Sequence, residues 1–105
     1  KAGSMLFCSG QIPLDPESGS LIAGGIADQT RRCLRSLEAV LEAGGARLDQ
    51  VVKTTVFLVD LGEFAAFNEV YAEFFSENPP ARSTVQVSAL PRGALVEIKA
   101  VAVLG

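Results

Sequence analysis

Histidine and tryptophan are absent from this chain of 105 residues, and cysteine occurs only at Cys8 and Cys33. Without an imidazole base, neither a Ser-His-Asp nor a Cys-His nucleophile can be assembled. Zinc sites are built mainly from cysteine and histidine, and two cysteines so far apart in sequence are not a ligand set. The composition therefore excludes the common histidine-dependent hydrolases and predicts no metal site.

A net positive charge and long apolar runs are also lacking. The net charge is −3, and the only basic cluster, Arg31, Arg32 and Arg35, falls on a predicted helix whose face is most simply solvated. A nucleic-acid surface requires a basic stripe, and a membrane-spanning helix requires about 20 apolar residues in succession. We therefore expect neither a nucleic acid nor a membrane as a partner.

Apolar residues, in contrast, make up 49% of the chain, against 20% charged residues. A domain of this size has much surface for its volume, so the apolar surplus predicts an oligomer that shares it. The low cysteine count and the lack of a recognisable signal peptide indicate a reducing compartment, which we expect to be the cytoplasm. The chain begins at Lys1 rather than Met, which suggests that an N-terminal segment is missing.

The hydrophobic pattern predicts one α+β domain over residues 1–105, with two helices on one face of a mixed sheet. Strands are expected at 5–9 and 51–59, the latter central and buried on both faces because nearly every position is apolar or β-branched. A first helix is expected between Gly24–Gly25, which precede it, and Gly44–Gly45, which end it. A second is expected after Asp60, its N-cap, and is stopped by Asn78–Pro79–Pro80. The stripe of the first helix comprises Ile26, Cys33, Leu34, Leu37, Val40 and Leu41.

Two final strands, "ARSTVQV" and "VEIKAVAV", alternate between polar and apolar positions. If they pair as a hairpin through Pro91–Gly93, Arg82 and Glu97 become cross-strand neighbours on the face left open by the helices. One interpretation is a solvated ion pair worth about 0–1 kcal/mol. The other is a site in which Arg82 binds a carboxylate through its planar fork and Glu97 transfers protons.

The residues favour the second interpretation, because "PARSTVQVSALPRGALVEIKAVAV" resembles the signature of the reactive-intermediate deaminase (RidA/YjgF) family. "LFCSGQIPLDPESG" and the middle segment from "QTRRCLRSLEAVLEAGG" to "FNEVYAEFF" are similar to that family too. The resemblance covers essentially the whole chain. It implies a chorismate-mutase-like fold, a homotrimer with clefts between subunits, and hydrolysis of 2-imino acids and their enamine tautomers to 2-keto acids and ammonia. Neither cofactor nor metal is implied.

The resemblance also implies roles for individual residues. Arg82 corresponds to the arginine that binds the substrate carboxylate, and Glu97 to the acid that positions water and moves protons. The remaining positions that match the family's pocket are Thr84, whose backbone contacts the substrate nitrogen, Ser9 and Gly10, which flank the pocket, and Asn68, at the subunit boundary.

Two departures leave alternatives open. Lys99 stands where the family has a second glutamate, and it could either pair with Glu97 or point into the centre of a trimer. The family also supplies a pocket tyrosine from the segment before residue 1, and this sequence does not show it, either because the protein lacks it or because that segment is not included. A non-catalytic trimer that binds a small carboxylate, with a regulatory or chaperone-like role, is therefore the alternative function. A ribonuclease, proposed for relatives, fits poorly with an acidic chain that lacks histidine.

Overall fold

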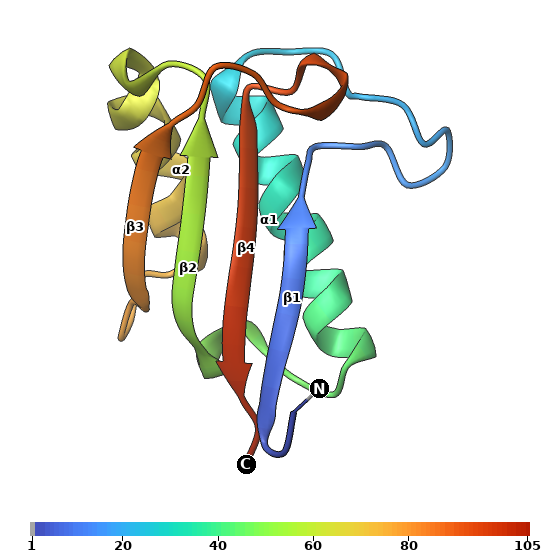
Figure 1. The fold of residues 1–105 in the computed structure, drawn as a ribbon, viewed down its shortest axis with the longest axis vertical. Helices are drawn as coiled ribbons and strands as arrows, with labels where there is room; N and C mark the ends of the chain where they lie inside the picture. The colour runs from blue at the N-terminus through green and yellow to red at the C-terminus, as the bar shows by residue number, and fades with distance from the viewer. Residues whose placement is uncertain (1) are drawn as a thin grey trace.

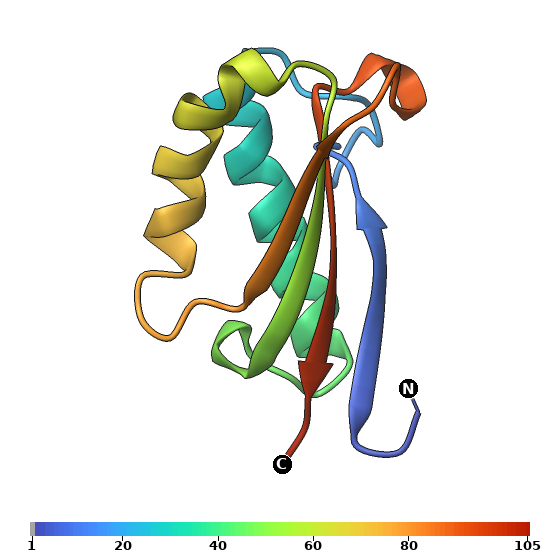
Figure 2. The ribbon, with the colours of Figure 1, turned by 60° about the vertical axis from the view of Figure 1, so that its left-hand side comes forward.

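The computed structural model describes residues 2–105 as one layer of strands covered by one layer of helices. The strands are β1 (Met5–Gln11), β2 (Val51–Leu58), β3 (Ala81–Gln86) and β4 (Val96–Val103), and the helices are α1 (Ile26–Ala43) and α2 (Phe64–Phe74). Short 3₁₀ turns precede β2, α2 and β4. The predicted mixed sheet with two helices on one face is confirmed (Figure 2).

The strand order is β1-β4-β2-β3, with β3 parallel to β2 and β4 antiparallel to both β1 and β2 (Figure 1). The predicted hairpin of the last two strands is therefore wrong, because β2 lies between β3 and β4. The reason is the connection β2-α2-β3, a helical crossover that brings the next strand back parallel to the first. The chain then crosses over β2 and inserts β4 into the middle of the sheet.

The core lies between the sheet and the helices. It is formed by alternate residues of the strands and one stripe of each helix, and its fully buried side chains include Leu34, Leu37, Leu41, Val56, Leu58, Phe67, Val96 and Ile98. Val40 was expected in the α1 stripe but is 38% exposed, because it lies at the edge of that stripe. Gly45 ends α1 with a φ of 85°, a left-handed conformation that favours glycine.

The face of the sheet that points away from the helices, the open face, is uncovered in residues 2–105 (Figure 2). β2 is central as predicted, but its burial alternates, so the expectation that both of its faces are buried is wrong for a single chain. The open face nevertheless presents large apolar side chains, including Met5, Phe7, Val85 and Val103. Their exposure, 58% for Phe7, is typical of a surface that another protein chain covers.

Candidate functional site

Arg82 lies on β3, the edge strand beside α2, on the helix side of the sheet. Its backbone partner in the register is Thr54, a fully buried residue whose hydroxyl contacts Tyr71 of α2. Partners in a sheet register point to the same face, so the expectation that Arg82 projects from the open face is wrong. Because β3 is the edge strand, the guanidinium of Arg82 reaches solvent while it packs against α2.

One stripe of α2 holds this guanidinium. Phe64, Phe67, Asn68 and Tyr71 follow the i, i+3, i+4, i+7 spacing that places residues on one side of a helix. Nη1 of Arg82 donates a hydrogen bond of 2.7 Å to Oδ1 of Asn68. The guanidinium carbon lies 4.7 Å from the ring centre of Tyr71 and 5.1 Å from that of Phe64. Such cation–π contacts orient a guanidinium while leaving its other N–H groups free to donate.

Tyr71 is itself fixed. Its hydroxyl and that of Thr54 are 2.7 Å apart, and burial raises the pKa of the phenol, an effect that the Thr54 hydrogen bond and the Arg82 charge partly oppose. The phenol therefore stays neutral at physiological pH. The aromatic residues of α2 form part of the core, and the edge of their stripe also supports the guanidinium of Arg82, a role that the sequence analysis did not identify. The signal available was Asn68, a polar residue within that stripe.

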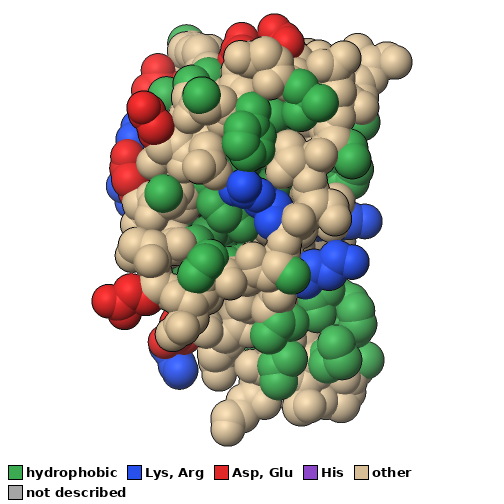
Figure 3. Space-filling view, turned by 90° about the vertical axis from the view of Figure 1, so that its left-hand side faces the viewer, with side chains coloured by type: hydrophobic (Ala, Val, Ile, Leu, Met, Phe, Trp, Pro, Cys, Tyr) green, Lys and Arg blue, Asp and Glu red, His purple; other side chains and the backbone are tan. Residues whose placement is uncertain are grey.

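Beside Arg82 lies a hollow of about 370 Å³. It is lined by Asn68, Tyr71, Ala72, Phe75, Pro79, Pro80 and Arg82. Figure 3 looks onto this edge of the molecule and shows basic side chains at its centre among hydrophobic ones, with acidic side chains at the periphery. A positive group in a largely apolar recess suits a small organic anion better than it suits a metal ion or a nucleic acid.

Thr84 follows Arg82 on the same side of β3. Its hydroxyl is buried and has no hydrogen-bond partner among residues 2–105. The structure thus brings three of the predicted residues together at the β3 edge: Arg82, Asn68 and Thr84.

Glu97 lies elsewhere, on the open face of β4. Its register partner is Phe57, whereas its neighbours Val96 and Ile98 are buried on the helix side. The carboxylate packs against Gly10 of β1, so close that a Cβ on Gly10 would overlap it. The pairing of β1 with β4 is interrupted between Cys8 and Gln11, which places Ser9 and Gly10 in this irregular segment.

Within one chain, therefore, Arg82 and Glu97 lie on opposite faces of the sheet with β2 between their strands. They form two separate groups of predicted residues: Asn68 and Thr84 lie beside Arg82, and Ser9 and Gly10 lie beside Glu97. The assignment of these residues to one functional site stays a prediction, whereas the expected cross-strand pair of Arg82 and Glu97 does not exist.

Lys99 shares the open face with Glu97 but does not pair with it, since residues 2–105 contain no ion pair between the two. Instead its Nζ lies 5.7 Å from the ring centre of Phe57 on β2. Of the two alternatives, the one in which Lys99 pairs with Glu97 is not adopted by the single chain.

Residues 2–105 contain no group of three or more histidine, cysteine or acidic side chains placed to hold a metal ion. Both cysteines are buried and unpaired. Burial raises the pKa of Cys33 far above its ordinary value. Its Sγ lies 3.3 Å from the backbone oxygen of Gln11 and 3.6 Å from that of Val96, two acceptors for its single proton. No helix in this part of the chain is long and apolar enough to cross a bilayer.

Comparison with known proteins identifies the family. The model of the Endoribonuclease L-PSP family matches residues 1–104. The chain belongs to this family. It is the family of the RidA and YjgF proteins, so the resemblance drawn from the sequence motifs is confirmed.

The sequence matches to relatives in this family cover most of the chain. A RutC family protein of Pyrococcus horikoshii is 53% identical, covering 97% of this chain and 81% of that protein. The human 2-iminobutanoate/2-iminopropanoate deaminase is 45% identical, covering 95% of this chain and 73% of the human protein.

Solved structures of family members share the fold. A protein of Thermotoga maritima superimposes with a TM-score of 0.97 at 50% identity, covering all of this chain and 83% of that one. Escherichia coli TdcF with bound serine superimposes with a TM-score of 0.94 at 42% identity, covering all of this chain and 84% of that one. The family thus includes a member that binds a small amino acid.

Proposed function

We propose that the protein hydrolyses reactive 2-imino acids and their enamine tautomers, such as 2-iminobutanoate and 2-aminoacrylate, to 2-keto acids and ammonia, without a cofactor. The observation that carries the proposal is the state of Arg82. Its guanidinium is oriented by Asn68 and Tyr71, yet it has no acidic partner in residues 2–105. An oriented guanidinium with free N–H groups at the rim of a hollow is a receptor for a carboxylate.

The active site in this proposal lies between two copies of the chain in a homotrimer. Arg82 and Glu97 lie on opposite faces, so one chain cannot bring both to a single small substrate. A second copy can do so by placing its β3 edge over the open face. Two features support this arrangement: the open face exposes Phe7 and Val85, and β3 presents an unpaired strand edge.

The chemistry is then divided between the Arg82 group of one copy and the Glu97 group of another. Arg82 binds the carboxylate and fixes C2 of the substrate, which lowers the entropic cost of water attack. Glu97 of the neighbouring copy donates a proton to C3 of an enamine, and the C2–C3 double bond becomes a C2–N double bond. The same carboxylate, now ionised, takes a proton from water as its oxygen bonds to C2. The resulting carbinolamine loses ammonia and leaves the 2-keto acid.

Thr84 and Ser9 complete the pocket in this proposal. The backbone of Thr84 contacts the substrate nitrogen, and Ser9 and Gly10 form the wall beside Glu97. The names of the human, rat and mouse relatives, each a 2-iminobutanoate/2-iminopropanoate deaminase at 45–46% identity, support the reaction class. TdcF with bound serine supports a ligand of this size and charge.

The test couples a threonine dehydratase, which releases the enamine, to the purified protein and follows 2-ketobutyrate formation. R82A should reduce the acceleration at least about 100-fold, because the substrate loses its anchor. R47A is the matched control, since Arg47 forms an exposed ion pair with Asp49 and does not line this hollow. An R82A variant with a rate near that of the wild type would refute the assignment.

The alternative function is a trimer that binds a small carboxylate without turning it over. It would be supported if the wild-type protein gave no acceleration in the coupled assay but bound 2-ketobutyrate saturably, with binding lost in R82A.

A further inference from the structure

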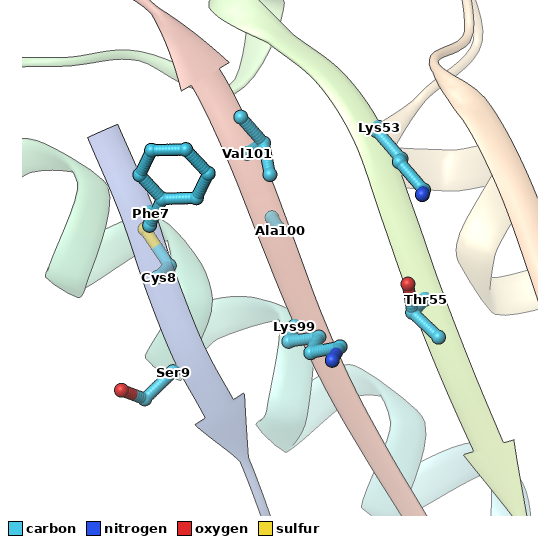
Figure 4. A pocket seen from close by; sticks show the side chains of 8 residues that line it. All are labelled: Phe7, Cys8, Ser9, Lys53, Thr55, Lys99, Ala100 and Val101. Carbon is cyan, nitrogen blue, oxygen red and sulfur yellow. The ribbon is translucent and has the colours of Figure 1, made fainter. Parts of the chain in front are cut away.

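A second polar site lies in the middle of the open face, away from the hollow beside Arg82. It is a cavity of about 340 Å³ lined by Phe7, Cys8, Ser9, Lys53, Thr55, Lys99, Ala100 and Val101 (Figure 4). Lys99 of β4 and Thr55 of β2 are register partners, and Lys53 precedes Thr55 by two residues. The two lysines are thus diagonal neighbours on adjacent strands.

Neither lysine is neutralised. The ion pairs in residues 2–105 involve Arg31 with Glu73 and Arg47 with Asp49, and neither Lys53 nor Lys99 takes part in one. The four strands contain one acidic residue, Glu97, which shares this face but makes no ion pair with Lys99. The centre of the open face therefore carries a surplus of positive charge, although the whole chain has a net charge of −3.

Trimer assembly would bury this positive charge, which is energetically unfavourable. The trimer proposed above covers the open face with the β3 edge of another copy, and the present inference rests on that assembly. β3, with the sequence ARSTVQ, supplies an arginine and no acid. Covering two ammonium groups without an opposite charge is unfavourable, because each loses water without gaining a partner. A bound anion offsets that loss.

We propose that Lys53 and Lys99, with the hydroxyl of Thr55, bind a small oxyanion that carries two or more negative charges. Phosphate and small polycarboxylates share this chemistry. The cavity is large enough for either, and its remaining walls are mostly apolar, which strengthens the attraction between charges once the face is covered. Bound in this way, the anion stabilises the assembled protein and is not a substrate.

The experiment measures thermal unfolding of the whole protein at fixed concentration, with sodium phosphate, sodium citrate or sodium chloride at equal ionic strength. At about ten times its dissociation constant, a bound anion should raise Tm by about 4 °C or more over chloride. A response to phosphate alone indicates an inorganic ligand, and a response to citrate alone indicates a polycarboxylate. Both results support the site.

The variants separate specific binding from the general stabilisation that both salts cause by exclusion from protein surfaces. K53M and K99M remove one charge each at nearly constant size and should abolish the extra rise in Tm. K99R should keep it, and R47M should keep it as well, since it removes a positive charge outside the cavity. Isothermal titration of phosphate should show at least a tenfold weaker affinity for K99M than for the wild type.

The proposal is overturned if neither anion raises Tm over chloride, or if the rise survives in both K53M and K99M. The anion site and the proposed function are tested separately, because R82A is expected to lose deamination and to keep the rise in Tm with phosphate. If K99M does not fold, K53M and titration of the wild-type protein decide the question, and an absent heat of binding rejects the site.

Discussion

Gly10→Ala tests whether Glu97 is held in a catalytically competent position. Gly10 has no positive φ, so alanine is compatible with the backbone. An added Cβ would lie 2.7 Å from Cδ of Glu97, whereas ordinary contact begins at 3.4 Å. The carboxyl group must therefore move by about 0.7 Å or more. Because that group is the end of a flexible side chain, it can move while the strand stays in place.

The expected effects on activity and stability consequently differ. A displacement approaching 1 Å at a catalytic group can cost about 100-fold, so we expect kcat/KM in the coupled assay to fall between about 10-fold and 100-fold. A non-ideal rotamer of Glu97 should destabilise the folded state by about 0.5–1.5 kcal/mol. Alanine also lowers the conformational entropy of the unfolded chain, which should stabilise the protein by about 0.4–1 kcal/mol. The free energy of unfolding should change by less than about 1 kcal/mol, a shift in Tm of a few degrees.

Gly25→Ala is the matched control, because a Cβ at Gly25 meets no atom within 4 Å. It should leave both activity and Tm nearly unchanged. A double-mutant cycle sharpens the test: if Gly10→Ala acts through Glu97, the G10A/E97Q variant should be no slower than E97Q alone. Wild-type kcat/KM in G10A, or losses that simply add in the cycle, would refute the role assigned to Glu97.

Three further predictions concern stability. The Cys33 thiol, whose pKa burial raises far above the ordinary 9.0, is protonated when folded and ionises when unfolded. The stabilisation that depends on this thiol is fully present below pH 9 and is lost progressively above it, because unfolding then releases a proton. The free energy of unfolding should therefore fall above pH 9 by up to about 1.4 kcal/mol per pH unit. Denaturant titrations at several pH values should find a smaller alkaline slope in C33A. F67A removes a fully buried ring and should cost about 3–5 kcal/mol, whereas L61A, at an exposed site, should cost under about 1 kcal/mol. T54V leaves the hydroxyl of Tyr71 without its partner and should cost about 1–3 kcal/mol by the same titration. An unchanged alkaline slope, an F67A cost like that of L61A, or a neutral T54V would contradict these assignments.

Local sequence patterns were sufficient to place the helices and strands and to indicate the family. Both helices and all four strands are local patterns, since the spacing of apolar residues and the glycines at the ends of α1 report directly on backbone periodicity. The motifs around Arg82, Glu97 and Ser9–Gly10 indicated the family, and comparison confirmed it. These features require no knowledge of which strands lie side by side.

The pairing of those strands, in contrast, follows from the fold as a whole. Alternation shows which residues of a strand share a face, but it does not say which face the helices cover or which strand lies next to it. The crossover through α2 placed β3 parallel to β2 and turned Arg82 toward the helices, whereas β4 kept Glu97 on the open face. The same pairing brought Lys53 and Lys99 together from distant parts of the chain. Contacts of this kind depend on strand order, which is a property of the whole fold and not of any one segment.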